Sequence, residues 1–231
     1  MYEELLNKLK KYDSDMAVCK YKICKGKKNI FLNSEFKEDV IKEEKIIPMF
    51  LQGEVLTAHL WNKLYKKRLF KDLKFNKYNM LEDMDIMYLV LERCKRISYI
   101  DEEYYYYVYN NMSLTRQYNI SMLSDFQQVI MQMFKHYDNR DDIKKYLNYN
   151  KTMLICTLFE NIAKSNTKLS NLTKYKNIYK IFKMSLIELR KKDKVLYNKF
   201  TRIQKLKINI LNFNVKIFII FNRIMRGMIK I

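Results

Sequence analysis

Two adjacent carboxylates, Glu82 and Asp83, are the side chains of this sequence best placed for acid–base chemistry. They lie at the start of a segment in which apolar residues recur with the periodicity of a helix, so that Met84, Met87 and Leu91 share one face. A helix N-terminus stabilises negative charge, so Asp83 can stay ionised at neutral pH. An ionised carboxylate can accept a proton from a hydroxyl group within hydrogen-bond reach. The alternative is that the two residues only cap the helix.

The segments around this pair are predicted to be one helix and two strands. We expect the helix over about residues 81–94, with Asn79 as its N-cap and Glu82 in the capping-box position three residues on. Residues 97–100 and 104–109 predict two strands separated by an acidic turn. In the second strand the side chains should alternate between two faces.

The N-terminal part is predicted to alternate helices and strands. A helix over residues 1–12 should feed a buried strand that starts at Met16. A second helix is expected over residues 36–51, where Pro48 indicates a kink or a break. A short strand or turn near residues 60–64 then leads to the carboxylate pair. This order of elements favours an α/β fold in the first half of the chain.

From about residue 119 the periodicity is helical. Three helices are expected over residues 119–137, 140–165 and 172–190, followed by one long helix from about residue 192. The chain has only 3 Gly and 1 Pro in 231 residues, so turns should be sparse and helices should dominate.

Positive charge is concentrated in the C-terminal part. The formal net charge is +20, and residues 151–231 hold 19 Lys+Arg against 3 Asp+Glu, a net of +16. Such an excess predicts an anionic partner, either a membrane surface or a polyanion. The final segment, residues 206–231, mixes Ile and Phe with Lys and Arg and has no apolar run long enough to span a bilayer. We expect it to lie in the plane of an anionic membrane surface, with packing onto the helical region as the alternative.

Five short motifs follow one another along residues 61–116. They are Trp-Asn-Lys-Leu-Tyr-Lys (61–66), Glu-Asp-Met (82–84), Ile-Ser-Tyr-Ile-Asp (97–101), a Tyr run (104–107) and Ser-Leu-Thr-Arg (113–116). Their order and spacing resemble those of bacterial family 2 glycosyltransferases, which have the GT-A-type fold and decorate cell-envelope polysaccharides. The resemblance covers about residues 1–117. It implies a Rossmann-like α/β half-domain there, followed by a helical, basic C-terminal region over residues 118–231.

The resemblance also implies roles for single residues. It implies inverting transfer of a sugar from a nucleotide sugar to a glycan or lipid-linked acceptor, with Asp83 as general base and Glu82 orienting it or the acceptor. The candidates for acceptor binding are Trp61, Asn62, Lys63 and Arg116. Each has a structural alternative, such as core packing for the Trp and a solvated turn for the Asn and Lys.

The nucleotide-binding motifs of the family are not found in this sequence. In the family an Asp-Asp-Gly-Ser motif and an aspartate loop of the N-terminal half hold the nucleotide sugar with Mg²⁺ or Mn²⁺, and we expect that half to be missing here. The four Cys and two His residues are not spaced as metal ligands. We therefore expect a fragment that binds no metal or cofactor of its own, is inactive alone, and lies at the cytoplasmic face of the cell membrane.

Two other interpretations stay open. The first is binding of single-stranded nucleic acid to the basic C-terminal part. Its Lys and Arg side chains can neutralise phosphates, and its interleaved Tyr and Phe rings can stack on bases. It has no recognisable binding motif, and its dense Ile and Phe favour lipid or packing, so we expect no nucleic-acid partner. The other alternative is a helical scaffold without catalytic activity.

Overall fold

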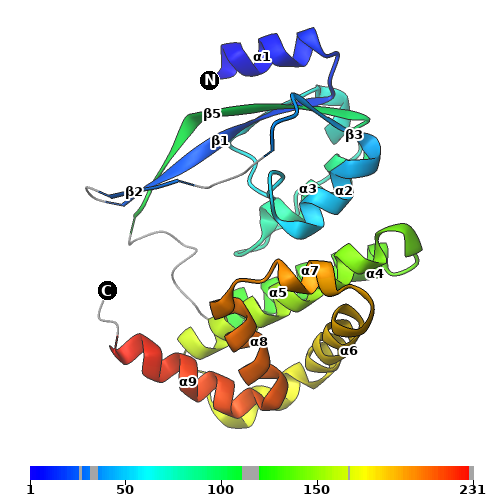
Figure 1. The fold of residues 1–231 in the computed structure, drawn as a ribbon. Helices are drawn as coiled ribbons and strands as arrows, with labels where there is room; N and C mark the ends of the chain where they lie inside the picture. The colour runs from blue at the N-terminus through cyan, green and yellow to red at the C-terminus, as the bar shows by residue number, and fades with distance from the viewer. Residues whose placement is uncertain (26–27, 32–35, 111–119, 166, 229–231) are drawn as a thin grey trace. The chain divides into compact units, whose positions relative to one another are not determined.

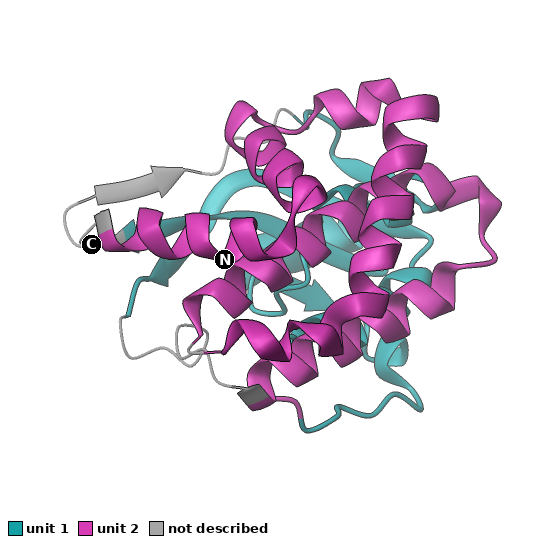
Figure 2. Cartoon of the chain, turned by 90° about the horizontal axis from the view of Figure 1, so that it is seen from below, with its two compact units in different colours: residues 1–77, 81–116 teal, residues 78–80, 117–231 magenta. Residues whose placement is uncertain are grey.

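The computed structural model describes residues 1–231 except residues 26–27, 32–35, 111–119, 166 and 229–231 (Figure 1). The chain divides into two compact units, coloured separately in Figure 2. Unit 1 consists of residues 1–77 and 81–116, and unit 2 consists of residues 78–80 and 117–231. Within the described residues the strands belong to unit 1 and unit 2 is helical, so the chain is an α/β protein with a helical C-terminal region.

Unit 1 is built around one central strand. Its elements are α1 (Tyr2–Lys11), β1 (Met16–Lys25), β2 (Lys28–Phe31), β3 (Val40–Lys42), α2 (Glu43–Gln52), β4 (Lys63–Tyr65), η1 (Lys67–Phe70), α3 (Glu82–Glu92) and β5 (Arg96–Val108). The described strands form a mixed sheet in the order β2-β1-β5-β3, and β4 also pairs with β1. One edge of β1 runs parallel to β5, and the other pairs antiparallel with β4 and then with β2. The register of the sheet is therefore set on β1.

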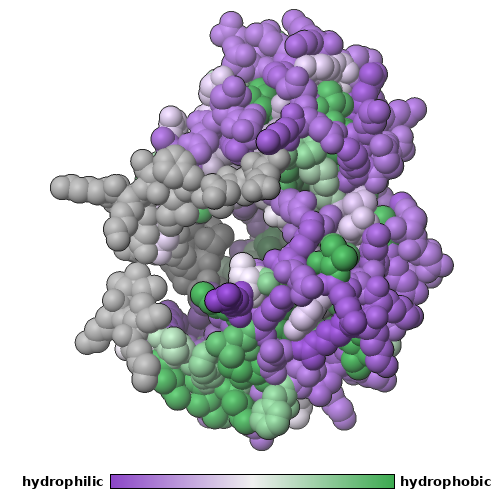
Figure 3. All heavy atoms as spheres, viewed as in Figure 1, coloured by the Kyte–Doolittle hydropathy of each residue, from purple (hydrophilic) through white to green (hydrophobic). Residues whose placement is uncertain are grey.

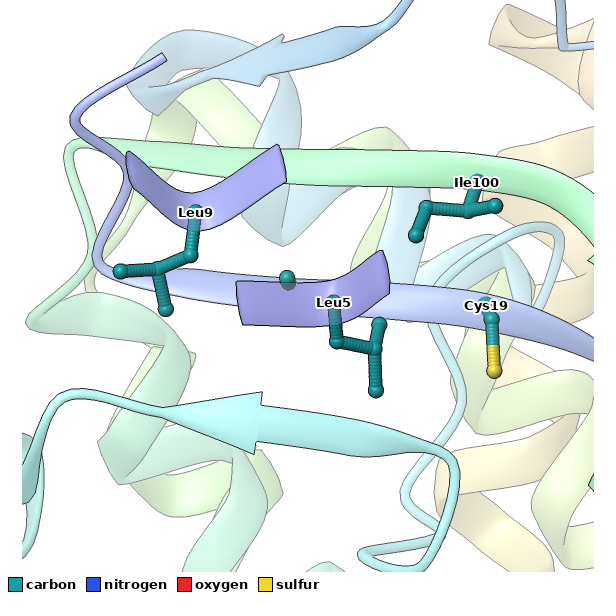
Figure 4. Packing of buried hydrophobic residues seen from close by; sticks show 5 residues of the cluster. Leu5, Leu9, Cys19 and Ile100 are labelled. Atoms are coloured by element: carbon teal, nitrogen blue, oxygen red, sulfur yellow. The ribbon is translucent and has the colours of Figure 1, made fainter. Parts of the chain in front are cut away.

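Helix α1 packs on this sheet through two leucines. Leu5 and Leu9, one turn apart, are buried with Ala17 and Cys19 of β1 and Ile100 of β5 (Figure 4). A helix of 10 residues is marginal in water by itself, so burial of this apolar face is what stabilises it. The predicted helix and the predicted strand after it are both confirmed.

A buried carboxylate joins the starts of β1, β5 and η1. Asp15 is only 4% exposed. Its carboxylate accepts hydrogen bonds from the backbone N–H groups of Lys95 (2.6 Å) and Arg96 (3.3 Å) and forms an ion pair with Arg68. A buried charge is tolerated only when it is paired and hydrogen-bonded, and Asp15 meets both conditions. Asp15 therefore fixes where the parallel pair of strands begins.

The helix predicted over residues 36–51 is wrong at its start, whereas its end is within one residue of the observed Gln52. Its first part forms β3, which pairs antiparallel with the start of β5, and only the second part is helical, as α2. Local periodicity does not reveal this pairing, because the partner strand lies more than 50 residues away. Pro48 does not end the helix, which runs on to Gln52. The stop is Gly53, which takes the left-handed conformation (φ 67°) favoured at helix C-termini.

The two strands predicted after α3 form the single strand β5. Cys19 pairs with Ile100, but the next residue, Lys20, pairs with Glu103, so β5 holds extra residues at this point. The predicted acidic turn is therefore a bulge inside a continuous strand. Lys20 also forms an ion pair with Asp101 in the bulge (2.6 Å).

Helix α3 is confirmed, but its predicted capping box is not. The N-cap residue is Leu81, which has a left-handed backbone (φ 64°) and makes no side-chain cap. Asn79 belongs to unit 2 and donates its backbone N–H and its Nδ2 to Asp125 of the same unit (2.8 and 2.9 Å). The Asn side chain expected to cap the helix is thus bonded elsewhere.

Unit 2 is arranged around α5. Its elements are α4 (Ile120–Tyr137), η3 (Asp141–Ile143), α5 (Lys144–Lys164), η4 (Leu169–Tyr175), α6 (Lys176–Lys192), α7 (Lys194–Asn198), α8 (Arg202–Phe213) and α9 (Val215–Met228). Helix α5 packs against α4, α6, α7, α8 and α9. The first three predicted helices are confirmed as α4, α5 and α6. In the part of the chain that the structure describes, no helix is long and apolar enough to cross a membrane.

The single long helix predicted from residue 192 is wrong, because three helices occupy this stretch. Thr201 and Gln204 form a capping box that starts α8. Asn214 ends α8 with an extended backbone, and its Oδ1 accepts the N–H of Lys216 (2.8 Å) at the start of α9. Apolar periodicity continues across these breaks, whereas the polar caps decide where each helix begins.

We predict that Asp15→Asn destabilises the protein by about 3 kcal/mol, because an amide cannot accept from two N–H groups and an arginine at once. Asp13→Asn is the matched control, two residues away. Asp13 is exposed, and Asn tolerates its left-handed backbone (φ 44°), so this variant should unfold like the wild type. Urea denaturation followed by circular dichroism measures both, and equal midpoints would contradict the role given to Asp15.

Candidate functional site

Asn62 attaches the segment before β4 to the central strand. It is 2% exposed, and its Nδ2 donates to the carbonyl oxygen of Cys19 (2.6 Å). In return the N–H of Cys19 donates to the carbonyl oxygen of Asn62 (3.1 Å). The Oδ1 of Asn62 accepts from the Nζ of Lys63 (2.8 Å). Both ends of its amide are therefore bonded within unit 1, which favours a positioning role over the predicted contact with an acceptor.

Lys63, the first residue of β4, has a buried amine. It is 3% exposed and donates to the Oδ1 of Asn62 and to the carbonyl oxygen of His59. Burial lowers the pKa of Lys63 to about 7, and the negative charge of Asp83 opposes this effect. The charge of Lys63 therefore changes near neutral pH, and it depends on the ionisation of Asp83.

Asp83, the second residue of α3, is the carboxylate that interacts with this lysine. It is half-buried, and the backbone N–H of Leu60 favours its charged form. The carbonyl oxygen of Leu60 accepts a hydrogen bond from the Tyr65 hydroxyl (3.2 Å). Burial and the neighbouring Glu82 raise the pKa of Asp83, while Lys63 and the Leu60 N–H oppose the rise. A carboxylate with a raised pKa is a stronger base than a free aspartate, which suits proton abstraction near neutral pH.

Trp61 belongs to an aromatic cluster on the adjoining part of the sheet. Its ring stacks on Tyr105 (4.1 Å between centroids), His59 (4.9 Å) and Tyr107 (5.7 Å), and it meets Tyr21 edge-on (4.6 Å). These partners hold the ring in place, and the indole is half-buried. The cluster favours a packed wall, and only the exposed part of the half-buried Trp61 ring is left for an acceptor.

The alternation predicted for the Tyr run is confirmed. Tyr105 and Tyr107 are half-buried in the cluster, whereas Tyr104 and Tyr106 are exposed. His59 is neutral in this setting, because burial, aided by the charge of Lys63, lowers its pKa to about 4. One face of β5 therefore supports Trp61, and the other faces solvent.

Lys63 and Asp83 lie close enough for their charges to interact, and Asn62, next to Trp61 in the chain, bonds to Lys63. Glu82 is exposed at the start of α3, where its charge acts on Asp83. Arg116 lies outside the described residues.

The described residues do not fit the divalent cation that the resemblance implies. No three His, Cys, Asp or Glu side chains come together among them. Cys19, Cys94 and Cys156 are buried free thiols, and Cys24 is a half-buried one. The amine of Lys63, whose charge acts on Asp83, repels a cation when it is protonated.

Sequence reasoning missed the third carboxylate in the first turn of α3. Asp85 is 6% exposed and accepts a hydrogen bond from the Nδ2 of Asn76 (2.7 Å). The signal was its position between apolar residues that are themselves buried or half-buried. The burial of Lys63 was also missed, and its neighbours Asn62 and Leu64 give no such signal. At Asp85 a charged residue inside an apolar run marks a buried, bonded group.

No family model matches this chain, and no curated protein is similar to it. The interpretation of the site therefore depends on the motifs and on the geometry described above.

Lys63→Met should remove a specific pH-dependence of stability. The unfolded amine (pKa 10.5) binds a proton that the folded amine (pKa about 7) has released, so between these pH values stability rises with pH. The wild type should therefore gain on the order of 3 kcal/mol relative to Lys63→Met from pH 7 to pH 10. Urea denaturation at several pH values measures this difference. Lys67→Met, at an exposed site, is the control and should follow the wild type.

The two charges beside Asp83 should move its pKa in opposite directions. Lys63→Met removes a positive charge and should raise the pKa of Asp83 further, whereas Glu82→Gln removes a negative charge and should lower it. Carboxyl ¹³C chemical shifts followed through a pH titration give the three values. Identical values in the wild type and both variants would show that the three groups do not interact.

Proposed function

We propose that unit 1 carries the acceptor side of an inverting glycosyl-transfer site, with Asp83 as the general base. The observation that carries this proposal is the half-buried carboxylate of Asp83 at the start of α3, whose charge interacts with the buried amine of Lys63. The order and spacing of the five motifs support the same interpretation, because they resemble those of family 2 glycosyltransferases. In these terms the fold of unit 1 corresponds to part of a GT-A-type domain.

In the proposed reaction an acceptor hydroxyl attacks the anomeric carbon of a nucleotide sugar. The new bond joins the acceptor oxygen to that carbon, and the bond from the carbon to the diphosphate oxygen breaks with inversion. Asp83 takes the hydroxyl proton as the new bond forms. Its raised pKa strengthens it as a base, and the Leu60 N–H and the charge of Lys63 oppose that rise.

The remaining site residues position this base and the acceptor. Asn62 holds Lys63 in place, and Glu82 raises the pKa of Asp83 from the exposed side. The edge of Trp61 would form a wall for a sugar ring of the acceptor, supported by Tyr105. The acceptor class that fits the resemblance is a glycan or a lipid-linked sugar at the cytoplasmic face of the membrane. Binding of the nucleotide is not assigned to any described residue.

Acceptor binding tests this proposal without a donor. The full chain is titrated with a panel of cell-envelope glycans and lipid-linked sugars by saturation-transfer NMR, and we expect binding to at least one class. Asp83→Asn should weaken that binding about tenfold or more, because it loses a hydrogen bond to a charged group. Asp72→Asn, at an exposed site of unit 1, is the matched control and should bind like the wild type. Equal affinity of Asp83→Asn and the wild type would contradict the role of Asp83.

A further inference from the structure

Helix α9 has an exposed apolar face. Ile217, Ile220 and Ile224 are 45%, 45% and 51% exposed, and their spacing of three and four residues places them on one side of the helix. Phe213, the last residue of α8, lies just before α9 in the chain and is 77% exposed. Figure 3 shows the result as a large apolar patch at the lower left, over α9. Contiguous exposed apolar surface of this kind marks an interaction site.

Packing within unit 2 does not account for this face. The opposite side of α9 contains Phe218 and Ile219, which are fully buried, and α9 packs on α5. A helix that served only to pack would have polar residues on its outer side. Helix α9 is instead apolar on its buried side and again on its exposed side.

Cations flank the exposed face, and acidic residues are missing around it in the sequence. Lys216 and Arg223 are seven residues apart, two turns along one flank of the helix. From residue 202 to residue 228 the chain has 6 Lys+Arg and no Asp or Glu. The surface that carries the apolar face therefore complements an anionic partner.

A basic cavity lies beside this flank, at the carboxyl end of α5. Arg223 donates to the carbonyl oxygen of Thr167 (2.6 Å), and Arg226 donates to that of Lys164 (2.9 Å). These residues and Lys168 line a cavity of about 540 Å³, and none of its described lining residues is acidic. A guanidinium group has five N–H donors, so both arginines keep donors for an anion.

We propose that the exposed face of α9 lies in the plane of a lipid bilayer that contains anionic lipids. Phe213, Ile217, Ile220 and Ile224 enter the boundary of the acyl chains, and the flanking cations lie at headgroup level. The cavity between α5 and α9 takes the phosphate of a lipid headgroup. This proposal does not depend on the glycosyl-transfer activity.

Charge favours a bilayer over a second copy of the chain as the occupant. A symmetric pairing through α9 would bring two cationic flanks together, in a region with a net charge of +16 over residues 151–231. Anionic headgroups instead neutralise these charges, and each Lys or Arg near such a surface adds to the attraction. The apolar stripe and the cationic flank are thus both satisfied by the same partner.

Vesicle flotation with the full chain tests the proposal. We expect binding to vesicles of phosphatidylcholine with phosphatidylglycerol, weak binding to phosphatidylcholine alone, and weaker binding as salt is raised. Ile220→Glu with Ile224→Glu should lower the partition coefficient at least tenfold. The matched control is Met184→Glu with Ile187→Glu in α6, which are 59% and 49% exposed and should leave binding unchanged. Circular dichroism and thermal melting confirm that both double variants are folded.

A second variant tests the charge. Lys168→Glu with Lys216→Glu changes two exposed side chains and should reduce binding to the phosphatidylglycerol vesicles and flatten its salt dependence. The proposal is overturned if the α9 double variant binds vesicles like the wild type, or if the α6 control loses binding equally. It is also overturned if the wild type binds single-stranded oligonucleotides but no vesicles. It is overturned as well if the wild type is a dimer that binds no vesicles and the α9 double variant is a monomer, because a second copy would then cover this face.

Discussion

The placement of the candidate site depends on the reciprocal hydrogen bonds between Asn62 and the backbone of Cys19. They attach the chain before β4 to the central strand. This attachment buries Lys63, whose Nζ then bonds back to Asn62. The same segment presents the Leu60 N–H to Asp83. One buried amide thereby links a strand, a buried amine and a helix N-terminus that are far apart in the sequence.

Unit 1 uses two buried polar groups at different points of β1 for different purposes. Asp15, at the start of β1, bonds to a backbone N–H group and to an arginine outside the candidate site, and it sets the register with β5. Asn62 acts near the middle of β1 and leaves Lys63 coupled to a partly solvated carboxylate. A carboxylate whose bonds are all satisfied contributes stability, whereas Asp83 keeps the partial exposure that chemistry requires. This contrast separates the structural carboxylate from the candidate base.

Local sequence signals were reliable where one apolar face decides the structure. The leucines of α1, the long helices α4 to α6 and the alternating Tyr run of β5 were all predicted from spacing. Signals failed where a distant partner decides. The strand β3 exists because β5 pairs with it, and Asn79 does not cap α3 because its backbone and side chain are held by hydrogen bonds to Asp125. In the candidate site, the position of Asp83 at a helix start was predictable, but the burial of Lys63 was not, because a distant segment of β1 creates it.

The contacts between the arginines of α9 and the carboxyl end of α5 contribute to the stability of unit 2. The last carbonyl groups of a helix carry a partial negative charge, and Arg223 and Arg226 neutralise it at the carboxyl end of α5. Helix α9 thus supplies hydrogen bonds to the last carbonyl groups of α5, while the other side of α9 is exposed. A ligand that binds only the docked form of α9 must also stabilise the fold around α5, by an amount set by its concentration and affinity. Stability of the helical unit and occupancy of its outer surface are therefore linked quantities.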